Sequence, residues 1–491
     1  MTTIASVTNL RLKFPGAESL LFKDLSLSFS KGEKVLILGP SGSGKSTLLQ
    51  VLTGLIPNSV EVPIKADEIK TPESWGFLFQ DPDSQFCMPY IDEEIAFVLE
   101  NLRVPREKME KYIRYYLEQV GLDFKNIHTN IQTLSGGMKQ RLAIASVLAL
   151  EPDVMFLDEP TAMLDPDGTK EVWNTIKKVS EDKTLIIVEH KIEHIIGIVD
   201  RVILMNNNGE IIADGQKEAI FQNYKDFLIT EGIWYPGVWE DYICYSKKQT
   251  PQIASIETES SITLTDFSGY RGKEKKIEVD HVNVKPGEWI AVLGDNGAGK
   301  STLLHSLMKL IKTKGSYQIF EEDEKQIKKI TDYVTFVFQN PEFQFVTNSV
   351  YDEIAYTLRL DKWTEEKIED RVKELLNFYH LDSRKDNHPY QLSMGQKRRL
   401  SVAAAIVKEQ PILLLDEPTF GQDAKNTFAI LEQLEAWREK GTTIIMVTHD
   451  LDIVKYFVSR VWIIEKGKLT EDVSASIYTK RLHTERQLVE S

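Results

Sequence analysis

Short apolar runs alternate with helix-patterned segments along the chain, and this alternation predicts its fold. Runs such as Val35–Leu38 and Ile412–Leu415 have the length of buried strands in a parallel sheet. Each half of the chain shows this order, which favours a mainly parallel sheet with helices on its faces. No apolar run reaches the roughly 18 to 20 residues that a membrane-spanning helix needs. The pattern predicts an α/β protein without a membrane span.

The sequence contains two copies of one pattern. KSTLLQVLTGLI (45–56) recurs as KSTLLHSLMKLI (300–311), and FLFQDPDSQF (77–86) recurs as FVFQNPEFQF (336–345). The distance between copies is far too long for a solenoid repeat, so it indicates a duplicated domain. We expect a first domain at 1–240, a polar linker at 241–260 and a second domain at 261–491. The aromatic stretch 232–245 should pack on the first domain, an interaction surface being the alternative.

Composition narrows the function classes. The 491 residues suit two domains of above-average size, and the net charge of −15 opposes binding to nucleic-acid phosphates. Cys87 and Cys244 are too few for a disulfide framework or a zinc site. The first residues, MTTIASVTNLRLKF, lack the pattern of a secretory signal. These features predict a cytoplasmic protein with no nucleic-acid partner, whose membrane role, if any, comes through other proteins.

Two glycine-rich turns fit the phosphate-binding pattern GxxxxGK[ST], each after a predicted strand and before a predicted helix. Glycines let successive N–H groups converge on phosphates, and the helix adds the positive end of its dipole. Lys45 and Lys300 would reach the β- and γ-phosphates of ATP, and Ser46 and Ser301 would bind Mg²⁺. The predicted nucleotide-binding residues of the two turns are Gly39, Pro40, Ser41, Gly42, Ser43, Gly44, Lys45, Ser46 and Thr47, then Gly294, Asp295, Asn296, Gly297, Ala298, Gly299, Lys300, Ser301 and Thr302.

An acidic pair ends an apolar strand in each half, in VMFLDEP (154–160) and ILLLDEP (412–418). Asp158 and Asp416 would contact Mg²⁺, and Glu159 and Glu417 would polarise the attacking water. A lone Asp-Glu pair is more often a solvated strand end. The apolar strand before each pair and the phosphate loop upstream reverse that preference.

LSGGMKQ (134–140) resembles the signature of ATP-binding-cassette ATPases, and LSMGQKR (392–398) is its counterpart. The resemblance implies two phosphate-loop nucleotide-binding domains, each with a helical signature subdomain. In that family two cassettes pair head to tail, with ATP between the phosphate loop of one and the signature of the other. It implies that Ser135, Gly137, Ser393 and Gly395 contact the γ-phosphate. Met394 replaces a signature glycine, which predicts a modified site that still works.

The resemblance extends to the family's other elements. Gln80 and Gln339 match the glutamine loop and its Mg²⁺ or water contact, and His190 and His449 match the switch histidine. Asp165 and Asp423 match the loop between sites, and Phe14 and Tyr270 are candidate adenine-stacking rings, with core packing as the alternative. The two composite sites would join Lys45, Gln80, Asp158, Glu159 and His190 to Ser393, and Lys300, Gln339, Asp416, Glu417 and His449 to Ser135.

The glutamine loops QDPDSQ and QNPEFQ resemble the Q-[DN]-P-[DE]-x-Q pattern of energy-coupling-factor importers. That family implies a transmembrane coupling subunit and a small membrane protein that binds a vitamin or metal ion, with thiamine or its pyrimidine precursor as the substrate suggested by the fused architecture. The ATPase would lie at the cytoplasmic face of the membrane. The acids after the loops are candidate docking residues or ordinary helix-start acids, namely Asp92, Glu93, Glu94, Asp352 and Glu353.

Two other classes remain as alternatives. Fused sugar-importer ATPases resemble this chain in architecture, but their second signature usually carries an inserted polar run that LSMGQKR lacks. Soluble ribosome-associated cassette ATPases have a long charged linker and an Asn-His-Leu-Asp sequence after Glu-Pro-Thr. This chain has a short polar linker, and the sequences at that place read AMLD and FGQD.

Overall fold

The computed structural model describes residues 2–17, 19–162, 164–246 and 259–490. Contacts divide the chain into two compact units, a first unit of Met1–Val238 with Asp423–Lys425 and a second unit of Trp239–Gln422 with Asn426–Ser491. Most of the predicted linker, 247–258, lies outside the described residues. Among the described residues, no helix is long and apolar enough to cross a membrane.

The first unit contains a mixed arrangement of strands and helices. Its elements are β1 Thr3–Leu12, β2 Phe22–Ser30, β3 Lys34–Leu38, α1 Lys45–Leu52, α2 Leu55–Asn58, β4 Ile64–Lys65, β5 Glu68–Lys70, β6 Trp75–Leu78, η1 Pro82–Ser84, α3 Ile91–Asn101, α4 Arg106–Gln119, η2 Ile131–Thr133, α5 Gly136–Leu148, β7 Val154–Asp158, α6 Pro166–Val179, β8 Thr184–Val188, β9 Arg201–Met205, β10 Ile211–Gln216, α7 Lys217–Asn223 and α8 Lys225–Glu231, followed by α9 Val238–Ser246 at the boundary.

The second unit repeats this arrangement. Its elements are β11 Ile262–Arg271, β12 Glu274–Val284, β13 Trp289–Leu293, α10 Lys300–Leu307, β14 Lys312–Ile319, β15 Glu322–Asp323, η3 Ile330–Asp332, β16 Val334–Val337, η4 Pro341–Phe343, α11 Val350–Leu360, α12 Glu365–Phe378, η5 Asp382–Arg384, η6 Pro389–Gln391, α13 Met394–Ile406, β17 Ile412–Asp416, α14 Ala424–Glu439, β18 Thr443–Val447, α15 Leu451–Tyr456, β19 Arg460–Glu465, β20 Lys468–Ser474 and α16 Ala475–Glu490.

The sheets explain why the apolar runs are continuous. In the first unit a six-stranded sheet has the order β10-β9-β3-β8-β7-β6, in which only β10 runs antiparallel to its neighbour. The second unit has the corresponding order β20-β19-β13-β18-β17-β16 within a ten-stranded sheet. Every residue of β7, β8, β17 and β18 is buried, because helices cover both faces of a parallel sheet. The predicted fold class is confirmed.

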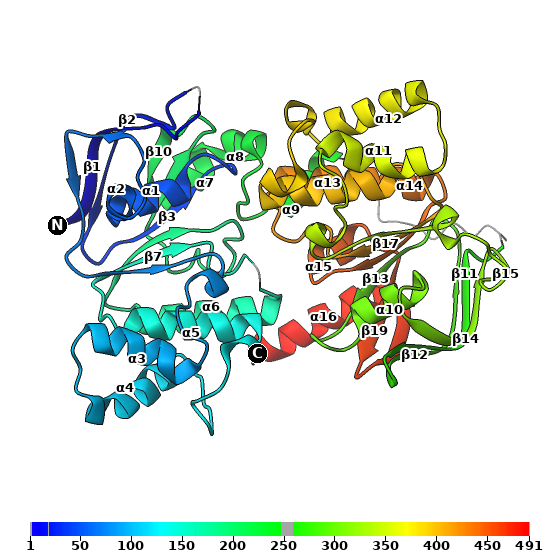
Figure 1. Ribbon diagram of the computed structural model, residues 1–491, viewed down its shortest axis with the longest axis horizontal. Helices are drawn as coiled ribbons and strands as arrows, with labels where there is room; N and C mark the ends of the chain where they lie inside the picture. Colours follow the sequence, from blue (N-terminus) through cyan, green and yellow to red (C-terminus); the bar gives the residue numbers. More distant parts are fainter. Residues whose placement is uncertain (1, 18, 163, 247–258, 491) are drawn as a thin grey trace. The chain divides into compact units, whose positions relative to one another are not determined.

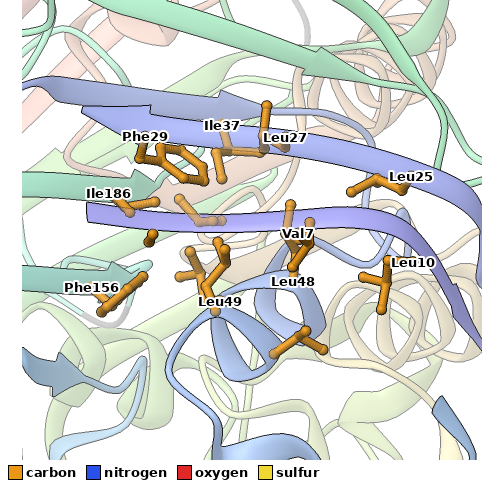
Figure 2. Packing of buried hydrophobic residues seen from close by; sticks show 14 of the residues in the cluster. Val7, Leu10, Leu25, Leu27, Phe29, Ile37, Leu48, Leu49, Phe156 and Ile186 are labelled. Atoms are coloured by element: carbon orange, nitrogen blue, oxygen red, sulfur yellow. The ribbon is translucent and has the colours of Figure 1, made fainter. Parts of the chain in front are cut away.

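A second, antiparallel sheet completes the core of the first unit. β1 pairs with β2, β4 and β5, and its buried residues alternate with exposed ones, as expected where one face is covered. Figure 2 shows Val7 of β1 beside Leu48 of α1 and Phe29 of β2 beside Ile37 of β3, all in one buried cluster with Leu49 and Ile186. The helix that carries the phosphate-loop lysine is thus packed between the two sheets.

A helical subdomain carries the signature in each unit. In the first unit, α5 contacts strand β6 and helices α3, α4 and α6, and Figure 1 shows α3 and α4 beside α5. In the second unit, α13 contacts β16 and α11 in the same way. Residues of both signature helices are therefore buried almost all round, which explains their weak amphipathic pattern.

The aromatic stretch 232–245 does not pack as predicted over its whole length. Lys191 and Lys225 of the first unit lie over the rings of Trp234 and Tyr235. Helix α9, however, packs within the second unit: the Tyr242 ring stacks on Phe428, with ring centroids 3.9 Å apart. The prediction is wrong for α9, because its rings, Trp239 and Tyr242, pack in an aromatic cluster with Phe428 and Phe457.

Candidate functional site

The two phosphate loops have the same backbone geometry. Gly42 and Gly44 have positive φ angles of 86° and 95°, and Gly297 and Gly299 have 77° and 113°. A Cβ on Gly44 would also lie 2.9 Å from the Phe22 ring, so conformation and space both require glycine there. Helices α1 and α10 start directly after Gly44 and Gly299, with no side chain capping them. Their first N–H groups are therefore available to an anion.

A lysine ammonium lies over each loop. Lys45 Nζ donates to Gly39 O at 2.8 Å and to Pro40 O at 3.0 Å. Lys300 Nζ makes the matching bonds to Gly294 O at 2.7 Å and to the carbonyl of the next residue at 3.0 Å. Burial lowers the pKa of Lys45, although Glu159 and Asp158 oppose this effect. Converging N–H groups and a buried ammonium fit the phosphates of ATP.

The predicted Mg²⁺ ligands lie together at the end of β7. Ser46 Oγ donates to Asp158 Oδ1 at 2.8 Å. Burial raises the pKa of Asp158 to about 6, even though the Ser46 hydrogen bond and Lys45 lower it, and burial likewise raises the pKa of Asp416 to about 6. Hydroxyl and carboxylate oxygens are the ligands that Mg²⁺ prefers. In the described part of the chain, no group of three or more His, Cys, Asp or Glu could hold a metal ion.

The predicted catalytic glutamate of the first unit is held by two other predicted site residues. Gln80 Nε2 donates to Glu159 Oε2 at 3.0 Å, and His190 Nε2 lies 3.0 Å from Glu159 Oε1. Burial alone would raise the pKa of Glu159, but the hydrogen bond and charge of His190, with Lys45, hold it below the ordinary value. In the second unit, His449 Nε2 lies 3.2 Å from Glu417 Oε1, and Gln339, which follows β16, is exposed.

Both glutamates have strained backbones. Glu159 has a φ of 46° and Glu417 a φ of 51°, values that non-glycine residues rarely adopt. Each peptide N–H nevertheless bonds to the neighbouring strand, Glu159 N to Val188 O at 2.8 Å and Glu417 N to Val447 O at 3.1 Å. Such conformations persist only where surrounding contacts hold them, and they are common at active sites.

The signature serines start helices α5 and α13 in the same way. Ser135 and Ser393 are the N-cap residues, with almost equal backbone angles, and each side chain accepts a hydrogen bond from the N–H three residues on. Met394 is 46% exposed. The methionine therefore leaves the local start of the helix unchanged, and its predicted effect on the ATP site remains a prediction.

The candidate adenine-stacking rings differ in exposure. Phe14 is 39% exposed, so it is not a core residue. Tyr270 is partly buried, with Lys314 Nζ 5.2 Å from its ring centroid. Asp165 caps α6 by accepting from Gly168 N at 2.6 Å. The nucleotide-related roles of these residues remain predictions.

In the first unit, three contacts attach the glutamine loop to the signature helix, and a fourth lies within the loop. Lys139 Nζ of α5 pairs with Asp83 at 2.7 Å, and Gln140 Nε2 donates to Phe79 O at 3.3 Å. Gln85 Oε1 accepts from Phe79 N at 3.3 Å, and its Nε2 reaches a carbonyl of α5 at 3.5 Å. We call these contacts the loop–signature brace.

The second unit has the same brace. Lys397 Nζ of α13 pairs with Glu342 at 2.6 Å, and Arg398 Nη1 donates to Phe338 O at 2.8 Å. Gln344 Nε2 donates to a carbonyl of α13 at 2.8 Å. The brace explains the Q-[DN]-P-[DE]-x-Q pattern. The [DN] residue caps a 3₁₀ turn that proline starts, the [DE] residue pairs with a signature lysine, and the last glutamine binds the signature helix.

Sequence reasoning missed several residues of the site. Lys139 and Lys397 could have been predicted from the sequence, because each signature contains a lysine and each glutamine loop contains an acid that could pair with it. Gln140 and Arg398 carried no such signal. Their side chains differ in type between the two copies, although both donate a hydrogen bond to a backbone carbonyl.

Another missed residue is Glu189, which precedes His190 where the second copy has Thr448. Its side chain is 3% exposed. Burial raises its pKa to about 7, and the charge of Glu159 adds to this effect, although hydrogen bonds from Thr161 and His190 oppose it. The difference between VEHK and VTHD was the signal that could have revealed it.

The docking prediction is wrong for two of the five candidate acids. Glu94 is 3% exposed and accepts from Cys87 N and Met88 N at 2.9 Å each. Glu353 is 4% exposed and accepts from Val346 N and from both the N–H and the hydroxyl of Thr347. Both carboxylates hold the turn after the glutamine loop, so they are not available to a partner.

The other three acids keep some exposure. Asp92 lies 3.1 Å from His128 Nδ1, and Asp352 pairs with Arg359 at 2.7 Å. Glu93 is half-buried. Docking by these three remains a hypothesis.

A family model described as "ABC transporter" matches residues 22–162 and 278–420. The chain belongs to the ABC transporter family. Each matched segment contains one phosphate loop and one strand-end Asp-Glu pair. The chain is therefore a tandem ABC ATPase that binds ATP, as its repeated motifs predicted.

Relatives cover nearly the whole chain. "Putative HMP/thiamine import ATP-binding protein YkoD" of Bacillus subtilis (strain 168) is 34% identical, over 96% of this chain and 91% of the relative. "Putative ABC transporter ATP-binding protein TTE1589" of Caldanaerobacter subterraneus is 35% identical, over 91% of this chain and 86% of the relative.

Among solved structures, the archaeal ribosome recycling factor aABCE1, in its complex with the stalk protein aP1, has a TM-score of 0.63 and 20% identity. It covers 97% of this chain and 92% of that one. At this identity the likeness shows the fold alone.

The brace should contribute to the stability of the first unit. The Lys139 side chain is only 12% exposed, so Asp83→Lys leaves an ammonium largely buried beside a second one. We expect Asp83→Lys and Lys139→Asp each to lower the free energy of unfolding by about 1 kcal/mol, and the double exchange to restore most of it. Urea titrations of the four proteins measure this coupling. The same exchange at the exposed pair Lys31–Asp153 should show almost none; equal coupling there would contradict a role for the brace.

The buried Glu189 should make stability fall as the pH rises. Its pKa is about 7 in the folded chain, against 4.5 as the ordinary value, so between these values the folded chain binds more protons than the unfolded one. The free energy of unfolding then decreases with pH. In Glu189→Gln this loss is absent, so the variant should gain on the order of 2 kcal/mol over the wild type between pH 5 and pH 8. Urea titrations at both pH values test this, with the exposed Glu181→Gln as the variant that should show no such gain.

Proposed function

We propose that the chain is the ATP-hydrolysing subunit of an energy-coupling-factor importer for a vitamin or metal ion, with HMP or thiamine as the first candidate substrate. The observation that carries the proposal is the loop–signature brace with the capped 3₁₀ turn beside it, which together give a physical reason for the last four fixed positions of the Q-[DN]-P-[DE]-x-Q pattern in both units. The relative named as an HMP/thiamine import ATP-binding protein, similar over nearly the full chain, supports the choice of substrate.

The site residues suit a division of labour in ATP hydrolysis. Lys45 and the loop N–H groups bind the phosphates, and Ser46 and Asp158 hold Mg²⁺ with Gln80 nearby. When bound there, the ion would supply positive charge to the phosphates. Glu159 accepts a proton from the attacking water or orients it, and His190 keeps the carboxylate in place. The corresponding residues have the same roles in the second unit, namely Lys300, Ser301, Asp416, Glu417, Gln339 and His449.

The proposed cycle follows the family resemblance: the two units would pair on ATP, and the signature serines Ser135 and Ser393 would each contact the ATP bound by the other phosphate loop. Closing of this pair on ATP and reopening after hydrolysis would move each helical subdomain. Because the brace joins α5 and α13 to their glutamine loops, that motion passes to the surface beside the loops.

The partner surface proposed here lies beside the glutamine loops. In the second unit, Phe343 is 76% exposed and Val346 is 65% exposed, with Asp352 nearby along the chain. Exposed apolar groups next to an acid suit a partner segment that is apolar and basic. A transmembrane coupling subunit of this chemistry, joined by a small membrane protein that binds the substrate, would hold the ATPase at the cytoplasmic face of the membrane.

Both sites should hydrolyse ATP, because both retain the glutamate and its histidine. We expect Glu159→Gln and Glu417→Gln each to lower the ATP turnover of the purified full chain at least tenfold, while Glu181→Gln, at an exposed position, leaves it unchanged. Steady-state phosphate release measures this. If one of the two substitutions were silent while the other abolished turnover, the claim of two active sites would fail.

The importer assignment is tested by what co-purifies with the chain from membranes. We expect the tagged full chain to bring down a polytopic subunit and small hydrophobic proteins, identified by mass spectrometry. Phe343→Glu should reduce their recovery about tenfold without changing ATP turnover, since it places a charge in the proposed contact. Tyr245→Glu, on α9 at 74% exposure, is the matched control and should bind normally. Recovery with ribosomal proteins in place of membrane proteins would overturn the assignment.

A further inference from the structure

Glu189 occupies a position that joins two parts of the candidate active site. It follows β8 directly and lies between Val188, whose carbonyl accepts from Glu159 N at 2.8 Å, and His190, whose Nε2 lies 3.0 Å from Glu159 Oε1. Both neighbours of Glu189 in the sequence thus contact Glu159. Its own side chain is 3% exposed and is hydrogen-bonded to the Thr161 hydroxyl and the His190 N–H.

The two carboxylate oxygens of Glu189 bind in different directions. Oε2 accepts from Thr161 Oγ1 at 2.9 Å, and Oε1 accepts from His190 N at 3.0 Å. Thr161 lies two residues after Glu159 and is 6% exposed. One buried side chain therefore ties the backbone of the switch histidine to the chain that follows the catalytic glutamate.

The strained backbone at Glu159 gives a physical reason for this tie. A φ of 46° needs contacts on both sides to hold it. On one side, the N–H of Glu159 is bound by Val188 O; on the other, Thr161 is bound by Glu189. Burying a carboxyl group is expensive, and hydrogen-bonded partners recover only part of the cost. Because burying the Glu189 carboxyl group costs free energy, its presence at this place favours a role in positioning the residues that it binds.

The second unit keeps the strain but not the tie. Glu417 has a φ of 51°, and its N–H binds Val447 O. The residue at the position of Glu189 is Thr448, 3% exposed, whose hydroxyl accepts from Asp450 N at 3.1 Å. This shorter side chain supports the turn after His449, on the other side of the histidine.

We propose that Glu189 is a positioning residue of the first unit, which fixes His190 relative to the segment after Glu159 and so makes the two ATP sites of the chain unequal. The proposal rests on the proposed roles of Glu159 and His190 in hydrolysis. The first site depends on a side-chain tie between its histidine loop and its glutamate segment, and the second site does not depend on one at the same place.

Two substitutions break the tie from opposite ends. Glu189→Thr gives the first unit the residue of the second, and Thr161→Val removes the hydroxyl at nearly constant volume. We expect each to lower the turnover number of the full chain about fivefold, with the KM for ATP changed less than twofold. The double variant should lose no more than either single one, because both remove the same contact. Glu189→Gln keeps an acceptor for His190 N and can donate to Thr161 Oγ1, so it should stay within twofold of the wild type.

The second unit supplies matched controls. Thr419→Val corresponds to Thr161→Val, and Thr448→Ser keeps its hydroxyl; both should leave the turnover number within twofold of the wild type. If Glu189→Thr does not fold, as judged by thermal unfolding, the comparison of Thr161→Val with Thr419→Val still decides the question.

Hydrogen–deuterium exchange gives a readout that does not depend on turnover. The amide of His190 should exchange at least tenfold faster in Glu189→Thr and unchanged in Glu189→Gln, while the peptide around His449 stays as in the wild type. Unchanged turnover or exchange in Glu189→Thr, or equal effects of Thr161→Val and Thr419→Val, would overturn the inference. Absence of ATP hydrolysis by the wild-type chain, or normal hydrolysis by Glu159→Gln, would instead overturn the proposed function.

Discussion

Each site depends on a pair of carboxylates held at the buried carboxyl end of a parallel strand. Asp158 and Glu159 follow from β7, whose residues are all buried, and Asp416 and Glu417 follow from β17 in the same way. Burial disfavours the charged form of a carboxylate, and it raises the pKa of Asp158 and of Asp416 to about 6. The surrounding groups therefore have to supply positive charge and hydrogen bonds, and the rest of the site is arranged to do so.

Those groups come from separate loops, each fixed by its own part of the fold. The phosphate-loop lysine and serine belong to a helix packed between two sheets, so they approach β7 from one side (Figure 2). The switch histidine follows the next strand, β8, and the glutamine follows β6 on the other side of β7. The parallel order of strands brings these loop ends together at one edge of the sheet. The signature helix is then connected to this edge through the brace.

The sequence allowed the fold and most of the site to be predicted, because its strongest signals are local. An apolar strand followed by GPSGSGKST or by Asp-Glu indicates both the local backbone structure and the chemistry of the site within ten residues. The contacts that sequence reasoning missed connect distant segments. Nothing near Glu94 indicates that its carboxylate would turn inward and bind Cys87 N, and nothing near Tyr242 indicates that its ring would stack on Phe428. Such choices are made by tertiary packing, which a helix-start pattern or an aromatic count does not specify.

The inequality of the two sites lies in residues that support the chemistry, not in those that perform it. Lysine, serine, aspartate, glutamate and histidine are the same in both units. Beside them, the first unit buries Glu189 and Gln140, whereas the second buries Thr448 and Arg398 at the equivalent positions. Burial lowers the pKa of Arg398 to about 10, although Glu417 and Asp416 oppose this effect. The guanidinium thus remains charged at neutral pH beside Asp416 and Glu417, whereas in the first unit the Glu189 carboxyl group lies near Glu159. The candidate catalytic residues are the same in the two units, but the buried residues around them differ in charge, so a duplicated domain can acquire two different sites without changing a candidate catalytic residue.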